Sequence, residues 1–296
     1  MKIILAKHSG FCFGVTRALT ITRSSRAENG PVDVLGELVH NEDVVRELSS
    51  QGIRTIKRLA VNGCNRILII RAHGVSRATV ARAQNHGYRV IDATCPMVKE
   101  IHAIARAQEQ QGYRVAIIGD RDHAEVKGIA GQLQRPGLVI DPAEPLPRLP
   151  AGKRICVVVQ STQDIEVVLP IVKRLRQHSN DVRFFNTICN PTRRKQAEIK
   201  RLPKQVDVMI IIGSRTSANT RRLHEISRSL NPRSYWVQGA AEIKPSWLAR
   251  VRTVGIAAGA STPQATIQTV MEKIRALAAL TGKNSSSGRR RSATRR

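Results

Sequence analysis

Short apolar runs alternate with amphipathic helical stretches along almost the whole sequence. Each of six interior runs is followed within a few residues by apolar residues at helical spacing. Strands that alternate with helices predict βαβ units and parallel sheets, so the expected fold class is α/β. The runs are residues 32–35, 66–70, 115–118, 155–159, 208–212 and 253–257. The helical stretches are residues 43–48, 78–84, 125–133, 165–175, 222–230 and 265–280.

Three cysteines repeat the same arrangement. Cys12, Cys95 and Cys189 each follow an apolar run and precede a helix-like stretch, with gaps of 83 residues (12 to 95) and 94 residues (95 to 189). These gaps are too wide for a local metal clip and suit one thiolate from each of three similar modules. We therefore expect nine strand–helix steps, three per module, with the three cysteines meeting at one metal centre.

The cysteine spacing also suggests how the chain divides. We expect α/β modules at residues 14–95, at 96–189, and at 190–282 together with 1–13, arranged as a pseudo-threefold trefoil around a central cavity. Residues 283–296 are strongly basic and are expected to form a disordered tail.

Positive charge is the main anomaly of the composition. Lys and Arg number 49 against 22 Asp and Glu, which gives a net charge of +27. Such an excess indicates polyanionic partners, namely nucleic acid, phosphorylated substrates or acidic proteins. A solvated basic surface without a dedicated polyanion site explains the charge equally well. No apolar stretch approaches the roughly 20 residues that span a bilayer, and the apolar start is too short for a secretion signal, so a cytoplasmic protein is expected.

The cysteine positions favour metal binding. Pro96 and Pro191 place Cys95 and Cys189 at or beside helix starts. Free N–H groups and the positive end of a helix are expected to lower the pKa of a thiol there. Structural zinc usually takes four ligands in close pairs, and a [4Fe–4S] cluster usually takes four cysteines. Three cysteines would leave one iron open to a substrate, whereas ordinary buried thiols are the alternative for any single one.

Polar side chains follow several of the predicted strands. Ligands of open α/β sheets bind outside the carboxyl ends of the strands, so these side chains are candidates for a common site. Backbone N–H and hydroxyl groups in such loops can bind phosphate, although a single His or Ser there is often only structural or a helix cap. The candidates are His40, His73, His123, Glu125, Ser161, Thr162, Ser217, Asn219 and Ser261.

Nine short segments contain the cysteines and polar candidates: residues 10–15, 39–41, 72–75, 92–96, 123–125, 160–162, 186–189, 217–219 and 258–261. Taken in order along the chain, they resemble the 4-hydroxy-3-methylbut-2-enyl diphosphate reductase family, which acts last in the non-mevalonate isoprenoid pathway. No single match is specific, but the ordered set covers the chain from residue 10 to about residue 263.

The resemblance implies a role for each candidate. Cys12, Cys95 and Cys189 would hold one [4Fe–4S] cluster per chain with one iron free for the allylic hydroxyl of the substrate. Glu125, His123 and Ser161 would form the catalytic group, with Glu125 and the Ser161 hydroxyl passing protons to the departing water. The residues that would bind the substrate, chiefly through its diphosphate, are His40, His73, His123, Ser161, Thr162, Ser217, Asn219 and Ser261.

The resemblance also implies the reaction and its partners. The reaction would be a two-electron reductive dehydroxylation that yields isopentenyl and dimethylallyl diphosphate. The electrons would come from an acidic ferredoxin- or flavodoxin-type donor, and no membrane partner is expected. The sequence departs from the family pattern at Ser161, where Thr is usual, and at Ala124, Ala218, Asp120 and Pro191. These departures bear more on substrate affinity than on the reaction.

Three other functions remain open from the residues alone. An open-cluster hydro-lyase would remove water without net electron input. A basic nucleic-acid-binding metalloprotein would explain the charge, although the aromatic residues needed for stacking amount to only 3% of the chain. A non-catalytic zinc protein would also use cysteines.

Overall fold

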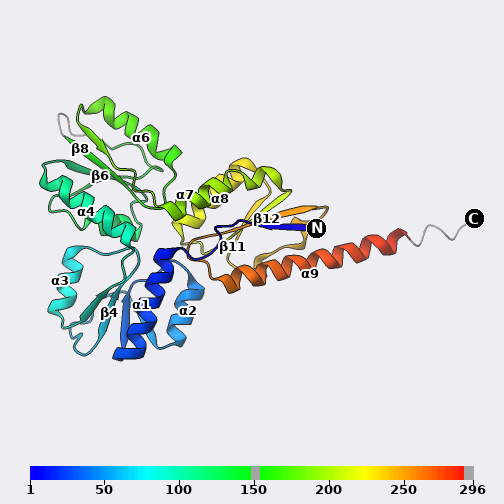
Figure 1. Cartoon of the computed structure of the whole chain (residues 1–296), viewed down its shortest axis with the longest axis horizontal. Coiled ribbons are helices and arrows are strands. Elements are labelled where there is room, and N and C mark those ends of the chain that lie inside the picture. The colour runs from blue at the N-terminus through cyan, green and yellow to red at the C-terminus, as the bar shows by residue number, and fades with distance from the viewer. Residues whose placement is uncertain (148–153, 290–296) are drawn as a thin grey trace, which may run out of the picture. The chain divides into compact units, whose positions relative to one another are not determined.

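The computed structural model describes residues 1–147 and 154–289 of the chain (Figure 1). They form three four-stranded sheets in which every strand pairing is parallel. The expected α/β class with parallel sheets is therefore confirmed. The chain separates into two compact units: unit 1 comprises residues 1–11 and the chain from Arg194 onward, and unit 2 comprises residues 12–193.

The first sheet of unit 2 has the order β3-β2-β4-β5. Its strands are β2 (Val32–Leu35), β3 (Ile53–Ile56), β4 (Ile67–Ile70) and β5 (Arg89–Asp92). Its helices are α1 (Phe13–Asn29), α2 (Glu42–Ser50) and α3 (Arg77–Asn85), with α1 and α2 on one side of the sheet and α3 on the other in Figure 1.

The second sheet of unit 2 repeats this topology with the order β7-β6-β8-β9. Its strands are β6 (Arg114–Ile118), β7 (Leu138–Ile140), β8 (Ile155–Val159) and β9 (Val182–Phe184). The accompanying helices are α4 (Pro96–Gln110), α5 (Ala124–Ala130) and α6 (Ile165–His178). Numbered along the chain, the strands of both sheets lie in the order 2-1-3-4.

The sheet of unit 1 has the same strand order, with the N-terminal strand β1 (Lys2–Leu5) in the position that the fourth strand occupies in the other two sheets. It runs β1-β12-β10-β11, with β10 (Val208–Ile212), β11 (Ser234–Val237) and β12 (Thr253–Ala258). Its helices are α7 (Asn190–Ile199), which begins just before the unit boundary, α8 (Ala218–Leu230) and α9 (Gln264–Arg289), with short 3-10 turns η1 (Leu202–Gln205), η2 (Ala240–Glu242) and η3 (Pro245–Leu248).

The central strands are mostly apolar because both faces of the sheets are covered; β2 is the exception in its interior, with the buried Asp33. Along β10, Val208, Ile210 and Ile212 pack into one core while Met209 and Ile211 pack into another. Strands buried on both faces read as continuous apolar runs, which explains why all central strands were predicted correctly.

Three strands were missed, and nine expected strands become twelve within residues 1–147 and 154–289. Each missed strand, β3, β7 or β11, lies at an edge of its sheet. They are three or four residues long, and each has at least two partly or fully exposed residues, whereas a central strand has at most one, at its end. An edge strand with one exposed side lacks the apolar run on which the prediction depended.

Residues 283–289 of the expected basic tail are drawn as the last part of helix α9, and the disordered tail stays a prediction. Elongating an existing helix adds one hydrogen bond per residue without a new nucleation cost. Residues 290–296 of the expected tail lie outside the described part of the chain. The module boundaries at 95/96 and 189/190 remain a prediction. No described helix combines the length and apolarity needed to cross a membrane.

Candidate functional site

The three cysteines occupy equivalent positions in the topology. Cys12, Cys95 and Cys189 follow β1, β5 and β9, the fourth strand of each sheet, and precede α1, α4 and α7. In all three places the cysteine carbonyl accepts the first helical N–H from the residue four positions on, at 2.9–3.0 Å. Helix α1 then packs on β2 and β4, and α4 packs on β6 and β8. Each of these two helices thus leads from the last strand of one sheet to the centre of the next.

The two cysteines that end the sheets of unit 2 share further local structure. An Asx side chain three residues earlier, Asp92 or Asn186, accepts the N–H two residues on, at 2.9 and 3.4 Å respectively. The N–H of each cysteine then donates to a carbonyl in the loop after the neighbouring central strand, at Ala72 (2.9 Å) or Ser161 (3.1 Å). Residues 92–95 and 186–189 therefore form the same kind of turn.

Two of the three thiols, those of Cys12 and Cys95, lie beside Gly14. A Cβ atom on Gly14 would lie 2.6 Å from the Cys95 Sγ and 4.0 Å from the Cys12 Sγ. Burial is the main cause that raises the pKa of Cys95 and of Cys189, and the charges of Cys12 and Glu125 raise both further. Cys95 and Cys189 therefore each lie within electrostatic range of the Cys12 thiol and of the Glu125 carboxyl.

Burial overturns the expected direction of the thiol pKa shifts. Burial raises the pKa of Cys189 to about 11, although hydrogen bonds from Thr192 act in the opposite direction. At Cys95, N–H groups of Met97 and Val98 at the start of α4 lower the pKa, but burial outweighs them. Such thiols stay protonated at neutral pH until a cation binds, because a coordinated thiol is deprotonated outright.

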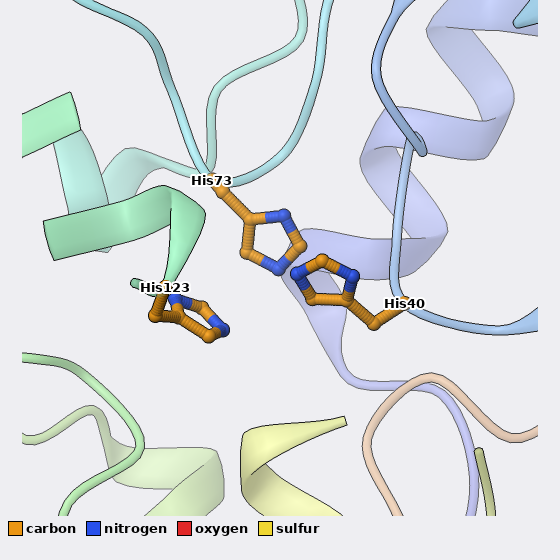
Figure 2. Close-up of side chains that lie close together, drawn as sticks. All are labelled: His40, His73 and His123. Carbon is orange, nitrogen blue, oxygen red and sulfur yellow. The ribbon is translucent and has the colours of Figure 1, made fainter. Parts of the chain in front are cut away.

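Three imidazole rings from separate loops face one another in unit 2 (Figure 2). His40 follows β2, His73 follows β4 and His123 precedes α5. The ring centroid of His73 lies 4.5 Å from that of His40 and 5.2 Å from that of His123, and the remaining pair is also 5.2 Å apart. Burial, followed by the charges of the other two imidazoles and of Arg71, lowers the pKa of His73 well below its usual value.

The partners of two of these rings indicate which nitrogen carries a proton. The Nδ1 of His123 accepts the N–H of Glu125 at 3.1 Å, which places the proton on Nε2. The Nδ1 of His40 lies 2.9 Å from the Glu37 Oε2 and donates to it. This hydrogen bond is the main cause that lowers the pKa of Glu37.

The ring nitrogens could in principle hold a metal ion, because one from each ring lies within 4.8 Å of the others. A metal needs the lone pair of each ligating nitrogen. At His123 the observed hydrogen bond leaves Nε2 as an N–H donor, which suits an anion instead.

Glu125 is buried and paired with Ser161. One carboxyl oxygen accepts the Ser161 N–H at 2.6 Å, and the other accepts the Ser161 hydroxyl at 2.9 Å. Only 2% of Glu125 is exposed, and burial raises its pKa to about 7 despite these two hydrogen bonds. A carboxyl with a pKa near 7 can both hold and release a proton at neutral pH. The neighbouring candidate Thr162 is engaged differently, since its hydroxyl accepts the amide N–H of Gln160 at 3.0 Å.

The candidates of unit 1 lie in the loops after its two central strands. Ser217 caps α8 by accepting the Thr220 N–H, and Ser261 follows β12. A Cβ at Gly213 after β10 or at Gly259 after β12 would meet the same Thr220 hydroxyl, at 2.6 and 2.1 Å, so the two loops are in close contact. The chain thus presents two adjoining polar loops at the switch point of this sheet.

Among these side chains, Asn219 combines burial with an unpaired hydrogen-bond donor. It is 95% buried, since 5% is exposed, and its Nδ2 has no hydrogen-bond partner in the described part of the chain. A buried amide donor left unpaired costs free energy, so such a group indicates a ligand or water as its partner.

Two residues of α7 that the sequence did not reveal organise the loop before Cys12. The buried Lys195 Nζ donates to the carbonyls of His8, Gly10 (2.9 Å) and Ala258 (3.3 Å). Glu198 accepts the N–H groups of residues 7 and 8 at 2.8 and 2.9 Å. Nothing in their local sequence distinguishes them from the other charged residues of an amphipathic helix.

Thiolates are ligands for soft metals, and a carboxyl that titrates near pH 7 can transfer protons. An α/β fold that brings thiols and such a carboxyl together has the features of an α/β metalloenzyme. Residues 3–275 match the sequence model of the family described as LytB protein. The chain belongs to this family, and the resemblance seen in the sequence is confirmed.

Relatives and solved structures agree with this membership. Over 274 residues the chain is 40% identical to the 4-hydroxy-3-methylbut-2-enyl diphosphate reductase of Geobacter sulfurreducens, with 93% of this chain and 97% of the relative covered. The enzyme of the same name from Aquifex aeolicus is 38% identical, with 93% and 96% covered.

Among solved structures, (E)-4-hydroxy-3-methyl-but-2-enyl diphosphate reductase is 36% identical with a TM-score of 0.67, with 93% of this chain and 99% of that chain covered. The E-1-hydroxy-2-methyl-but-2-enyl-4-diphosphate reductase from Plasmodium falciparum is 25% identical with a TM-score of 0.84, with 92% and 87% covered.

Family membership implies an iron–sulfur cofactor, and the residues present fit one. The donors are three thiols, the ligand type that iron–sulfur clusters prefer. Gly14 carries no Cβ at a point where one would lie only 2.6 Å from the Cys95 Sγ, so the space beside that sulfur stays open.

Proposed function

We propose that the chain is a 4-hydroxy-3-methylbut-2-enyl diphosphate reductase. The reaction uses two electrons and two protons: the allylic C–O bond breaks, the hydroxyl leaves as water, and the second proton goes to carbon. The products are isopentenyl and dimethylallyl diphosphate. The observation that carries the proposal is that Cys95 and Cys189 both lie within electrostatic range of Cys12 and of Glu125, whose pKa is about 7.

The cofactor of this proposal is one [4Fe–4S] cluster per chain, held by Cys12, Cys95 and Cys189. Bound there, the cluster would pass the two electrons of the external donor to the substrate one at a time and would offer a Lewis-acidic iron. The remaining chemistry belongs to side chains of the protein.

The three histidines bind the substrate diphosphate. His123 suits this role because its Nδ1 already accepts a backbone N–H, so its Nε2–H is directed to donate to an anion. Glu37 orients His40 through the 2.9 Å hydrogen bond at Nδ1. We also assign diphosphate binding to Ser217, Asn219 and Ser261, and substrate contacts to Ser161 and Thr162. For Asn219, the unpaired buried Nδ2 supports the role.

Glu125 supplies the proton that converts the departing hydroxyl into water. With a pKa of about 7, a substantial fraction of the carboxyl is protonated at neutral pH. The Ser161 hydroxyl, 2.9 Å from the Glu125 carboxyl, is placed to relay that proton. His123 completes the catalytic group by fixing the backbone of Glu125 through the N–H that its ring accepts.

The electron donor is an acidic ferredoxin- or flavodoxin-type protein. The net charge of +27 supports this assignment, because a basic surface steers an acidic partner and an anionic substrate alike. The protein works in the cytoplasm, without a membrane partner, and nucleic acid is not a partner in the reaction.

The test is turnover by anaerobically purified protein, measured with and without a chemical reductant. Reductive dehydroxylation requires the reductant and consumes two electrons for each product molecule. Turnover of the same substrate without an electron donor would instead favour an open-cluster hydro-lyase. Metal analysis of the same preparation separates both from a zinc protein, because the proposal requires iron and acid-labile sulfide.

A further inference from the structure

A basic cavity in unit 2 has no part in the proposed reaction. It encloses about 660 Å³ and is lined from three segments around residues 35–36, 57–59 and 71–86, together with the start of α5. None of the three histidines that face one another is among the residues that line it. Five of its lining residues are Lys or Arg, and none is Asp or Glu: Lys57, Arg58, Arg71, Arg82 and Lys127.

Most of this positive charge is not neutralised by the protein. Lys127 pairs with Asp122 at 2.8 Å. Lys57, Arg58 and Arg82 are exposed and form no ion pair within the described residues. Uncompensated like charges around one concavity repel one another, so an anionic ligand that binds there relieves the repulsion.

Arg71 provides an observation independent of surface charge. Its Nε is buried without a hydrogen-bond partner in the described part of the chain. Its guanidinium lies against the backbone of Gly36, where a Cβ would meet the Arg71 Nη1 at 2.5 Å. A buried guanidinium N–H left unpaired costs free energy that a ligand oxygen would offset.

The rest of the lining suits a phosphorylated ligand with an apolar part. Ser76 caps α3 at the cavity wall, and its hydroxyl lies 2.8 Å from that of Thr79. Both hydroxyls can bind phosphate oxygens beside the positive end of a nine-residue helix. Leu35, Leu59 and Val75 line the same cavity and would contact a short hydrocarbon group.

We propose that this cavity is a second anion site that binds a small organic diphosphate, with the phosphates on Arg71, Arg82, Lys57 and Arg58. The site stands whether or not the chain has the proposed reductase activity, because it shares no side chain with that machinery. Arg71 precedes His73 by two residues, so a ligand bound here can alter the affinity of the histidines for substrate.

The experiment is isothermal titration calorimetry on anaerobically purified protein at two salt concentrations. The probes are inorganic diphosphate and dimethylallyl diphosphate. The test variant is K57A/R58A/R82A, and the matched control is K173A/R174A/R176A, which removes the same charge from exposed positions of α6 outside the cavity lining.

Wild type and control are expected to show two classes of site for both probes. In the test variant, one of these classes should bind the probes at least tenfold more weakly. The lost class should bind dimethylallyl diphosphate more tightly than inorganic diphosphate, because of Leu35, Leu59 and Val75. Equal weakening in test and control variants would overturn the proposal, as would a test variant that keeps wild-type affinity in every class of site. A single class in wild type that the test variant loses would leave the cavity proposal standing and would count against the histidine site instead. Arg82→Glu alone gives a second check: it should weaken the same class more than Arg82→Ala does, and equal binding by the two would contradict the assignment.

Discussion

The two sheets of unit 2 share one topology and differ in the chemistry of their loops. Both have the strand order 2-1-3-4, and both end in a cysteine that starts the next helix. After the central strands β2 and β4 come His40 and His73, whereas after β6 and β8 come the Glu125 region and Ser161. The strand order therefore decides where a functional side chain lies, and the loop residue decides what it does.

This comparison assigns different tasks to the two sheets. The first sheet supplies two of the three imidazoles, one of them oriented by Glu37, for binding an anion. The second supplies the third imidazole, His123, and a buried carboxyl hydrogen-bonded to a hydroxyl, for moving a proton. Substitutions of His40 and His73 should therefore act mainly on KM and those of Glu125 and Ser161 mainly on kcat, whereas the cysteines should behave alike.

The largest effect is expected from the equivalent cysteines. Cys95→Ser and Cys189→Ser should each abolish stable cluster assembly, because a serine oxygen is a poor substitute for a soft thiolate ligand. Iron content and visible absorbance after anaerobic purification measure the loss. Cys64→Ser is the control, since that thiol is exposed and lies beside Gly87 and not beside Gly14. A fully active, iron-replete Cys95→Ser protein would disprove the equivalence.

The next largest effect on activity is expected from Glu125→Gln. The amide cannot donate a carboxyl proton, so kcat should fall by at least about 100-fold while iron content is unchanged. Steady-state kinetics beside iron analysis distinguish lost chemistry from lost assembly. Glu100→Gln, an exposed carboxyl on α4, is the matched control. Near-normal turnover by Glu125→Gln would remove this residue from the proton path.

His40→Gln tests the other sheet. Loss of a hydrogen bond to a charged group costs about 1.5–3 kcal/mol, so KM should rise by roughly 10- to 100-fold with little change in kcat. His178→Gln, on the exposed face of α6, should leave both constants unchanged. If His40→Gln lowered kcat and left KM unaltered, the division of tasks between the sheets would be wrong.

The pH dependence follows from the raised pKa of Glu125. The folded-state pKa of about 7 lies above the usual 4.5, so the protonated form is available below pH 7 and is lost above it. Turnover should therefore be flat below pH 7 and fall by about tenfold per pH unit well above it. A pH–kcat profile checks this, and the residual activity of Glu125→Gln should lack that limb.

The same raised pKa also has a cost for stability. Because the folded state binds the Glu125 proton more tightly than the unfolded state, its contribution to stability decreases as the pH rises from about 4.5 to about 7. The group that enables proton transfer thus weakens the fold at the pH where it works.

Sequence reasoning recovered the parts of the fold that rest on local pattern. Most central strands are continuous apolar runs, and the helix starts at Cys95 and Cys189 are marked by nearby prolines. The edge strands β3, β7 and β11 were missed because their half-exposed residues lack that pattern. Pairing to a neighbouring strand, which is not a local property, makes them strands.

The electrostatics of the site could not be predicted in the same way. A helix start favours a thiolate, and the sequence shows the helix start. The burial that raises the pKa of Cys95 and Cys189 comes from segments distant in the chain. Lys195 was missed for a similar reason, since its role depends on carbonyls at residues 8, 10 and 258.

The smallest effect is expected from Ser161→Thr, which restores the residue usual in the family pattern. The hydroxyl that donates to Glu125 at 2.9 Å is retained, and the β-branched side chain holds its rotamer more firmly. Against this, Ser161 is only 7% exposed, so the added methyl group must find room in a packed site. The two effects oppose each other, and kcat should stay within about threefold of wild type. Ser161→Ala, which removes the hydroxyl, should lower kcat clearly more; equal kcat in the two variants would show that the hydroxyl carries no proton.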